Sequence, residues 1–583
     1  MNCPSRTEEP ECDGMNQNPS SLSADLTTRE DLNGIANARM LRRISSSEIR
    51  GMEEQEFDKT QPPEKGTVAE KMAEVEGDHG DGRGTGETGG SGHGVIPGQP
   101  PHDRSKNLLW RAQKLAVTFA RFIGPGFMIA VAYIDPGNYA TGVAAGATYK
   151  FKLLFIVLMS NLFAIFLQSL CVKLGSVSGL NLAESCRAFL PWWLNIFLYV
   201  LAEGAIIATD IAEVIGTAIA INLLIPKIPL VAGCALSIAD VLLILLFYKP
   251  NGTMKGLRAF EFFVMALVLG VVICFCIQLS LIENTSVGEV FRGYLPSSAI
   301  VQSDGLYQSC GILGATVMPH SLYLGSGIVQ PRLREYDVKH GLAAPANESD
   351  DESTHKDIYY PSLSAINFCL KYSIAELIIA LFTFALFVNS AILITAGASL
   401  YGSDAADADL FGIYDLLSNS IGPAAGKIFA LALLLSGVSA GIVCTIAGQM
   451  VSEGALNWTI APWMRRLITR SISITPSIII AGAVGRPGLS AALNGSQVAL
   501  SVALPFISAP LIYFTCRNKY MTVGVHAQGA AGDEGHTDVG ARVLQTKKMR
   551  NHWVTAAIGV TIWLIITVMN VANLVLLGKG EGE

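Results

Sequence analysis

Two short motifs place polar groups inside long apolar segments of the sequence. The first is the run Asp135-Pro136-Gly137-Asn138, which interrupts the apolar segment 124–142. Proline has no backbone N–H and glycine tolerates unusual backbone angles, so we expect a helix to unwind at this run. A carboxylate at the centre of a bilayer costs about 2.5–3.5 kcal/mol on insertion scales, and unwound backbone there must line a polar cavity or be buried in protein. The alternative is a proline kink with a hydrogen-bonded aspartate.

The second motif is Met318-Pro319-His320, which interrupts the apolar segment 311–327. Pro319 should break this helix as well. His320 is the only one of the nine histidines that lies well inside an apolar segment, and a lone buried histidine is more often structural than a ligand. The pairing of the two segments favours function, because interrupted segments at matching positions of two repeats indicate the substrate site of a transporter.

Together the two motifs offer ligands for a cation. Asp135 has an anionic oxygen, Asn138 an amide oxygen and Met318 a thioether sulfur. Unwound helix ends also expose backbone carbonyls, which we expect to include those of Ala132 and Ala315, and a helix C-terminus carries partial negative charge. A thioether gains nothing with Ca2+ or Mg2+, which prefer oxygen ligands, but it favours borderline and softer transition metals. A single carboxylate without a thiolate predicts modest affinity, which suits a carrier better than a storage site.

The rest of the sequence is dominated by segments long enough to span a membrane. Half of the residues are hydrophobic and 15% are charged, against about 25% charged in soluble proteins. A helix needs about 20 apolar residues to cross about 30 Å of hydrocarbon. Such segments lie near residues 118–144, 151–175, 193–222, 228–248, 258–282, 304–330, 368–398, 424–451, 467–486, 492–515 and 552–577. The predicted fold class is therefore an all-α integral membrane protein with about eleven transmembrane helices.

Residues 1–106 differ in composition from the rest of the chain. They are rich in Glu, Asp, Gly, Ser and Pro and contain no long apolar run. We therefore expect a disordered acidic tail without a cleavable signal peptide, followed by a transmembrane domain over residues 107–578. The tail is a candidate contact for trafficking or ubiquitination machinery, and nothing in the charge pattern indicates binding to nucleic acid. The eleven cysteines include no CxxC pair, so neither a disulfide framework nor a thiolate metal site is expected.

The distribution of lysine and arginine predicts the orientation of the spans. One set of alternate loops and span ends carries most of these residues: Lys173, Arg187, Lys249, Lys255, Arg258, Arg332, Arg334, Lys339, Lys356, Lys371, Arg465, Arg466, Arg517, Lys519, Arg542, Lys547, Lys548 and Arg550. The other set carries Lys150, Lys152, Lys227, Arg292 and Arg486. Because basic loops face the cytoplasm, we expect the N-terminal tail on the cytoplasmic side. The sequon Asn284-Thr285-Ser286 would then face outward.

The two motifs resemble the signature of the Nramp family, which are proton-coupled divalent metal transporters of the leucine-transporter fold. The resemblance covers residues 115–578 and is closest in appearance to fungal manganese carriers. It implies two inverted five-helix repeats, over about 118–282 and 304–515, and an extra helix over about 552–577. It also implies a set of metal contacts: Asp135, Asn138, Met318, the carbonyls of Ala132 and Ala315, and Gln497. Ala503 departs from the pattern, because many members have glutamine there.

Three carboxylates lie in the apolar segment 193–222. Glu203, Asp210 and Glu213 fall within about 80° of one helical face. Carboxylates inside a membrane need partners or water, and proton relays are a common reason for their presence. The resemblance implies a proton pathway through these three residues and His320, with Arg470 as the partner of the carboxylates. The alternative is a buried structural network of salt bridges.

These observations predict a secondary active transporter that imports divalent transition-metal ions. We expect Mn2+ and also Fe2+ as cargo, coupling to protons, alternating access around a midplane site, no bound cofactor and no enzymatic step. The membrane is the plasma membrane or an endosomal or vacuolar membrane. One alternative is a sodium- or amino-acid-coupled carrier of the same fold, and another is a metal sensor without transport. An intramembrane metalloenzyme would need clustered ligands such as HExxH, which one intramembrane histidine does not supply.

Overall fold

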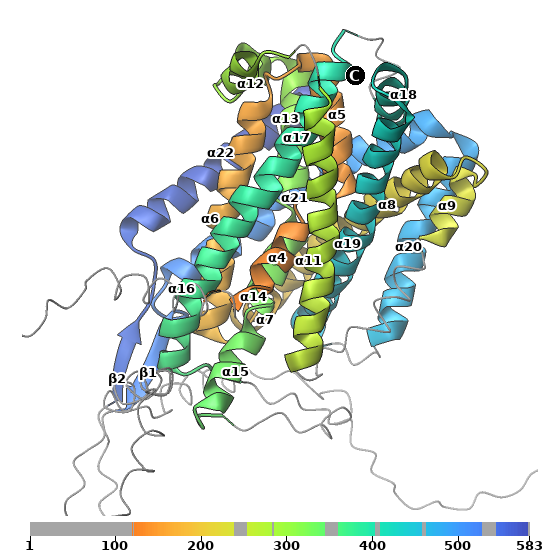
Figure 1. Cartoon of the computed structure of the whole chain (residues 1–583). Coiled ribbons are helices and arrows are strands. Elements are labelled where there is room, and N and C mark those ends of the chain that lie inside the picture. Colours follow the sequence, from red (N-terminus) through yellow and green to blue (C-terminus); the bar gives the residue numbers. More distant parts are fainter. Residues whose placement is uncertain are drawn as a thin grey trace, which may run out of the picture.

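The computed structural model of the chain describes residues 119, 122–237, 254–282, 285–343, 359–402, 409–457, 462–526 and 544–580. The tail predicted over residues 1–106 and Asn284 of the sequon lie outside these ranges. The described part is a bundle of long helices (Figure 1). This confirms the predicted helical membrane fold class.

The described helices follow the predicted spans closely. Their bounds are α4 (Pro125–Val131), α5 (Pro136–Tyr149), α6 (Leu154–Ser178), α7 (Leu182–Phe189), α8 (Trp192–Leu224), α9 (Leu230–Leu236), α11 (Met254–Ser280), α12 (Val287–Gly293), α13 (Ser303–Thr316), α14 (Pro319–Gly327), α15 (Gln330–Lys339), α16 (Leu363–Ala380), α17 (Leu386–Ser399), α18 (Leu410–Ser420), α19 (Pro423–Leu456), α20 (Pro462–Ala483), α21 (Arg486–Cys516) and α22 (Trp553–Gly578). A 3-10 turn, Ser298–Val301, precedes α13, and a π-helical turn, Leu381–Ala385, joins α16 to α17.

Among the described residues, 8 helices are long and apolar enough to cross a membrane. Three of the predicted spans are not among them, each for a different reason. The first is divided into α4 and α5 by the break before Pro136. The one predicted near 228–248 is described only as far as residue 237. The one near 467–486 falls in α20, whose apolar part, Leu467–Ala483, is shorter than the others.

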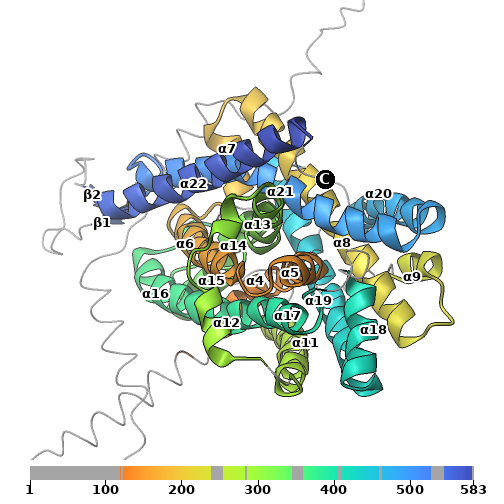
Figure 2. The same cartoon turned by 90° about the horizontal axis from the view of Figure 1, so that it is seen from above.

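Four short helices lie in the interior of the bundle. Figure 2 shows α4, α5, α13 and α14 near its centre, with α6, α17, α19 and α21 around them. The helices can approach closely where one of them has glycine: a Cβ at Gly175 of α6 would clash with the Ser326 carbonyl oxygen of α14. By contrast, only 22% of the most apolar window of α22 is buried, so this helix lies on the outside.

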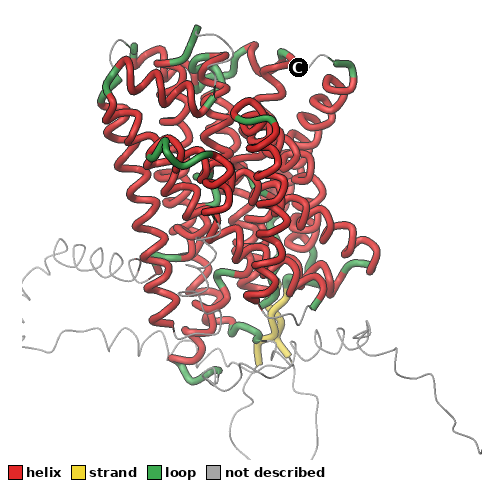
Figure 3. Tube along the Cα trace, turned by 90° about the vertical axis from the view of Figure 1, so that its right-hand side faces the viewer, coloured by secondary structure: helices red, strands yellow, loops and turns green. Residues whose placement is uncertain are grey.

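A two-stranded antiparallel sheet, β1 (Thr522–His526) with β2 (Leu544–Lys548), connects α21 to α22. No strand was expected from the sequence, so this hairpin is an addition to the predicted architecture. Figure 3 shows the strands at one end of the bundle, the end that also carries α15 in Figure 1. We call this the hairpin end. The chain after β2 is tied to the bundle, because Asn551 accepts a hydrogen bond from Lys173 Nζ at 2.8 Å.

Asp337 of α15 anchors the chain where it returns to α16. Its buried carboxylate accepts hydrogen bonds from the Tyr359 hydroxyl and from the backbone N–H and hydroxyl of Ser362, which caps α16. Burial and the neighbouring Asp337 carboxylate raise the pKa of the Tyr359 hydroxyl. Tyr359 therefore stays protonated and continues to donate to Asp337.

Replacing Asp337 with alanine should destabilise this end of the fold. The change removes the acceptor for three donors, and a hydrogen bond to a charged group contributes about 1.5–3 kcal/mol. We expect a loss of about 2–4 kcal/mol, seen as a lower midpoint of thermal unfolding for the detergent-solubilised protein. Asp415→Ala is the matched control, because Asp415 is exposed on α18. Equal midpoints for the two variants would show that Asp337 is not an anchor.

Candidate metal-binding site

The two helix breaks meet in the interior of the bundle. The α4–α5 break runs from Ala132 to Asp135, and the α13–α14 break falls at Val317 and Met318. Asn138, in the first turn of α5, donates from Nδ2 to the Ala315 carbonyl oxygen at 3.2 Å. Two motifs that are far apart in the sequence are therefore within hydrogen-bond distance of each other.

The prolines explain why carbonyl oxygens are available at the breaks. In a continuous helix the N–H of residue i bonds to the carbonyl of residue i−4. Pro136 and Pro319 have no N–H, so the carbonyls four residues before them, those of Ala132 and Ala315, lose their helical donor. Each proline then starts a new helix at its first position, where no donor is needed.

The two carboxylate oxygens of Asp135 differ in their contacts at the start of α5: one caps the helix and the other is free of hydrogen bonds among the described residues. It is the N-cap residue, and its Oδ1 accepts from Asn138 N at 2.9 Å and from Asn138 Nδ2 at 2.7 Å. The residue is fully buried, and its other oxygen, Oδ2, has no hydrogen-bond partner among the described residues. A buried carboxylate oxygen without a donor is costly. A bound cation would remove that cost.

The side-chain amide of Asn138 lies between an oxygen of each break. Its NH2 group donates to both Asp135 Oδ1 and Ala315 O, so these two oxygens converge on one position. An amide can be turned by 180° to exchange its oxygen and nitrogen. Turned in this way, the Asn138 oxygen would take the place of Nδ2 beside Asp135 Oδ1 and Ala315 O, so a cation bound next to them would meet three oxygens.

Gln497 and Met318 are two further buried residues beside the breaks. Gln497 of α21 is fully buried, and its side chain lies against the backbone at Gly137, where a Cβ would clash with it. Its Oε1 has no hydrogen-bond partner among the described residues. Met318 is the N-cap residue of α14, three residues after Ala315, and is buried. The structure thus brings carboxylate, amide and carbonyl oxygens together beside the break that holds the thioether.

A pocket approaches these residues from the end opposite the hairpin. It lies between α5, α13 and α21 and is lined by Thr141, Ala144, Tyr307, Gln308, Gly311, Asn494 and Val498. Thr141 is one turn beyond Asn138 on α5, and Asn494 is one turn before Gln497 on α21. An ion in this pocket would be about one helical turn from the candidate site.

Comparison with known proteins decides the family. The family model described as natural resistance-associated macrophage protein-like, Nramp, matches residues 126–529. The chain belongs to the Nramp family. It is 50% identical to the manganese transporter SMF1 of Saccharomyces cerevisiae, over 84% of this chain and 93% of that protein. It is 56% identical to the iron transporter SMF3 of the same yeast, over 70% of this chain and 83% of that protein.

A solved Nramp-like structure supports the same fold. The crystal structure of a manganese transporter from Eremococcus coleocola matches with a TM-score of 0.62 and 30% sequence identity, over 82% of this chain and 88% of that one. The family and fold expected from the two motifs are therefore confirmed.

In this Nramp chain, two of the three predicted carboxylates share one arginine. Arg470 of α20 is 2.9 Å from Asp210 Oδ1 and 3.1 Å from Glu213 Oε2, and all three residues are buried. Ser473 donates to the other oxygen of Asp210 at 3.3 Å. Glu203 is half-buried and lies about two turns nearer the start of α8, outside this ion pair. The stripe therefore divides into a paired group and a more exposed carboxylate.

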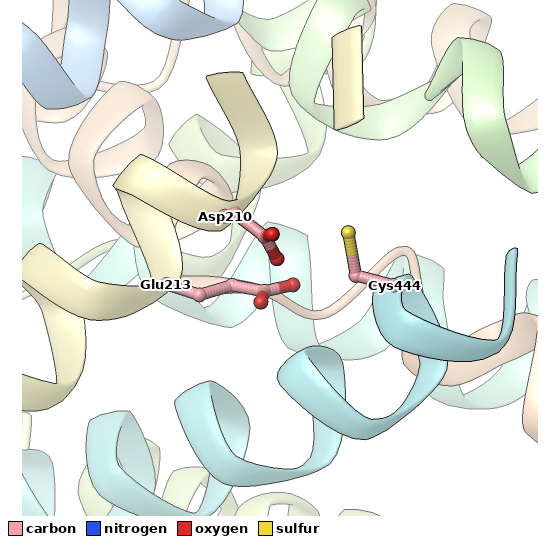
Figure 4. A group of neighbouring side chains, drawn as sticks. All are labelled: Asp210, Glu213 and Cys444. Atoms are coloured by element: carbon pink, nitrogen blue, oxygen red, sulfur yellow. The ribbon is translucent and has the colours of Figure 1, made fainter. Parts of the chain in front are cut away.

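A thiol lies beside the paired carboxylates. Figure 4 shows Asp210 and Glu213 on α8 directed toward Cys444 of α19, and ligand atoms of the three lie within 4.8 Å of one another. Such a cluster has the ligand types of a metal site. Here the Arg470 guanidinium already occupies the carboxylates. A cation would have to displace it, so we assign this cluster to ion pairing.

His320 links the candidate metal site to the paired carboxylates. It follows the α13–α14 break, is buried, and its Nδ1 is 3.4 Å from the Thr209 hydroxyl of α8. Thr209 immediately precedes Asp210. The structure therefore places the histidine between the break and the stripe on α8.

Several interior polar contacts have no motif that would reveal them. Gln168 of α6 donates to the Tyr133 hydroxyl at 2.8 Å and to the Ser321 carbonyl at 2.9 Å, and so bridges the two breaks. Glu376 of α16 accepts from the backbone N–H groups of Gly124 and Gly126 at the start of α4. The sequence indicates these contacts only by a single Gln or Glu inside an apolar segment, and the hydrogen-bond partner of that residue cannot be predicted from it.

Proposed function

We propose that this chain is a secondary active transporter that carries divalent transition-metal ions, Mn2+ and also Fe2+, through a membrane. One observation carries the proposal: the Asp135 carboxylate and the Ala315 carbonyl, from two different broken spans, lie so close together that both accept hydrogen bonds from the buried Asn138 amide. The names of its relatives support the choice of cargo, since one is a manganese transporter and another an iron transporter. The metal is the cargo, and no catalytic step is needed.

The proposed transport cycle begins at the end opposite the hairpin. The ion enters the pocket beside Thr141 and Asn494, loses most of its water, and the Asn138 amide turns its oxygen toward it. Asp135, Met318, Gln497 and the carbonyls of Ala132 and Ala315 supply the other contacts. A rearrangement of the broken helices then opens a path toward the hairpin end. Both breaks border the site, so movement of either half-helix changes access to it.

We place the hairpin end in the cytoplasm. The described basic residues gather there, including Arg517, Lys519, Lys547 and Lys548, and basic loops face the cytoplasm. Entry of the ion is then import. An inside-negative potential favours it by about 2.3 kcal/mol per charge per 100 mV, so a divalent ion gains about 4.6 kcal/mol.

Proton coupling is the second part of the proposal. Asp210 and Glu213 carry two negative charges against the single positive charge of Arg470. Carboxylates inside a membrane are a common component of proton relays. His320, beside Thr209, gives a route from the metal site to this cluster, and the half-buried Glu203 gives a route from the cluster toward the hairpin end.

A selectivity measurement tests the assignment of the site. Met318→Ala removes the soft ligand and leaves the oxygen ligands, which Ca2+ and Mg2+ also accept. We expect about a tenfold loss of the preference for Mn2+ over Ca2+, equivalent to about 1.4 kcal/mol. The measurement is uptake of labelled Mn2+ into proteoliposomes with increasing Ca2+ or Mg2+ outside.

Met464→Ala is the matched control, because Met464 is an exposed methionine of α20. An unchanged preference in the Met318 variant would favour a same-fold carrier of sodium or amino acids. Wild-type protein that binds Mn2+ but moves none into the liposomes would favour a sensor.

The cellular setting completes the proposal. We assign the transporter to the plasma membrane or to an endosomal or vacuolar membrane, and we propose residues 1–106 as the contact for trafficking or ubiquitination machinery. The acidic, Gly-rich composition of these residues supports a role outside the transmembrane domain. Deletion of the segment should change the membrane in which a tagged protein is found and leave Mn2+ uptake by the purified protein unchanged.

A further inference from the structure

Five cations are exposed on the hairpin and the chain next to it. Arg517 and Lys519 precede β1, Lys547 and Lys548 end β2, and Arg550 precedes α22. We call these five residues the hairpin surface. The described residues 513–526 and 544–554 contain no aspartate or glutamate. None of the five cations forms an ion pair with another described residue. Within the described part of the chain, no carboxylate neutralises their charge.

The hairpin holds these cations in fixed positions. Lys547 pairs with Val523 and Lys548 with Thr522 in the two-stranded sheet. Arg517 lies over the Tyr513 ring at 5.2 Å and Lys519 over the Tyr520 ring at 5.7 Å. An aromatic ring holds a cation by its negative face. The Arg517 and Lys519 side chains are thus partly ordered before any partner binds, which lowers the entropic cost of binding.

The hairpin itself is attached to the bundle. Met549 N donates to Met521 O at 2.8 Å and extends the strand pairing, and Asn551 N donates to Thr515 O of α21 at 2.9 Å and ties the hairpin to the bundle. Phe189 of α7 contacts the Tyr520 ring with centroids 4.6 Å apart. The nearest acidic group on α7, Glu184, bonds to the backbone N–H of Asn181 and caps its own helix. The cations therefore form a fixed basic platform on the transmembrane domain.

The outer surface of α22 sets the level of this platform relative to the membrane. Val554, Ile558, Leu564 and Val568 are exposed along the helix, so in a bilayer they must face acyl chains. Trp553, at the first turn, is 73% exposed, and tryptophan prefers the level of the lipid headgroups. Arg550 is only three residues before it. The hairpin surface therefore lies beside the headgroups of the leaflet on its side.

We propose that the hairpin surface binds the headgroups of anionic phospholipids. The observations that carry this are five exposed cations without an ion pair among the described residues, the absence of acidic residues from the described segments 513–526 and 544–554, and the lipid-facing start of α22. A cluster of four to eight basic residues next to a transmembrane helix is typical of such recognition. The proposal rests on the orientation proposed above, in which this end faces the cytoplasmic leaflet, where anionic lipids are concentrated.

Lipid retention by the full-length protein tests the proposal. Protein purified in detergent is titrated with phosphatidylserine, a phosphatidylinositol phosphate or phosphatidylcholine, and bound lipid is counted by native mass spectrometry. We expect the two anionic lipids to bind in preference to phosphatidylcholine. Because each cation near a membrane surface contributes about a fivefold factor, the triple variant Lys547→Gln/Lys548→Gln/Arg550→Gln should bind the anionic lipids more than tenfold more weakly.

A matched variant removes three cations at the opposite end. Lys152, Lys227 and Arg292 are exposed there, and their combined change to glutamine should leave lipid retention unchanged. A charge-conserving variant, Lys547→Arg/Lys548→Arg/Arg550→Lys, should retain the lipids and so show that the hairpin tolerates substitution. Size-exclusion profiles of all variants establish that they are folded.

Three results would overturn the proposal. One is equal retention by the wild type and the Lys547/Lys548/Arg550 glutamine variant, and another is an equal loss in the opposite-end variant. The third is complete competition by a soluble headgroup, such as an inositol phosphate, at the same concentration as the lipid, since that would identify a soluble phosphate compound as the ligand. Lipid retention is measured without metal uptake. A negative lipid result would therefore leave the transport proposal intact, and a protein that does not transport Mn2+ could still be tested for lipid binding.

Discussion

Metal uptake should fall at least a hundredfold when Asp135 is replaced by alanine. Among the described residues, Asp135 supplies the only formal negative charge at the meeting point of the two breaks, and its Oδ2 has no partner there. Loss of one partner of a buried charge pair costs about 3–5 kcal/mol, and about 2.8 kcal/mol already corresponds to a hundredfold change. The measurement is the initial rate of labelled Mn2+ uptake into proteoliposomes.

Asp135→Asn separates charge from shape. It keeps a side-chain oxygen for the cap of α5 but removes the negative charge. If this variant transports Mn2+ at the wild-type rate, the carboxylate is not the ligand that the geometry indicates. Asp415→Asn, an exposed position on α18, controls for the general effect of losing one carboxylate.

Mn2+ binding without transport gives a second measurement on the same variants. A ligand present at a hundred times its Kd stabilises the folded state by about 2.7 kcal/mol. We expect Mn2+ to raise the midpoint of thermal unfolding of the wild type and to leave Asp135→Ala unchanged. A normal Mn2+ shift in the alanine variant would place the ion elsewhere.

Replacing Arg470 with alanine should have the largest effect on stability. The Arg470 guanidinium lies 2.9 Å from Asp210 and 3.1 Å from Glu213. Without it, both residues would be buried carboxylates with no cationic partner at that position. Removing one member of a buried ion pair costs about 3–5 kcal/mol. We expect a lower yield of folded protein and a lower midpoint of thermal unfolding. Arg486→Ala, which removes an exposed arginine stacked on Phe411 at 4.4 Å, should cost less than about 1 kcal/mol.

A neutral replacement of the whole cluster distinguishes structure from proton movement. The variant Asp210→Asn/Glu213→Gln/Arg470→Met keeps approximate shape and removes all three charges, and such replacements of buried ion pairs are often neutral or stabilising. Its stability should therefore recover relative to Arg470→Ala. Its Mn2+ uptake should no longer move protons, as read by a pH-sensitive dye inside the liposomes. Wild-type proton movement in this variant would assign the cluster to structure alone.

The sequence by itself determined where the helices break. A proline removes the hydrogen bond to the residue four positions before it, and this effect needs no knowledge of the rest of the fold. Pro136 and Pro319 therefore identify Ala132 and Ala315 as residues with available carbonyls. The apolar segments likewise fixed the helical membrane class, because their length is matched to the bilayer. The span predicted near 467–486 showed the limit of that rule, since its apolar part in the structure is short.

The tertiary structure alone decided which groups face one another. Asn138 reaches Ala315 across 177 positions of sequence, and Gln497 reaches the break at Gly137. Glu376 caps α4 across 252 positions. The pairing of Arg470 with the carboxylates was implied only by family resemblance. Helices of similar apolar composition do not specify their neighbours, so such contacts are set by packing of the whole bundle.

The hairpin is another feature that could not be predicted from local sequence. Its strands are five residues each, Thr522–His526 and Leu544–Lys548, with a long stretch of sequence between them. A short turn motif such as Asn-Gly predicts a hairpin from the sequence. The sequence between these two strands contains no Asn-Gly pair. Strand pairing across a long loop depends on the surface that holds the strands, here the ends of α6 and α16. Helix breaks can therefore be predicted from the sequence, because they depend on local backbone chemistry. Contacts between distant segments cannot, because they form only when the bundle packs.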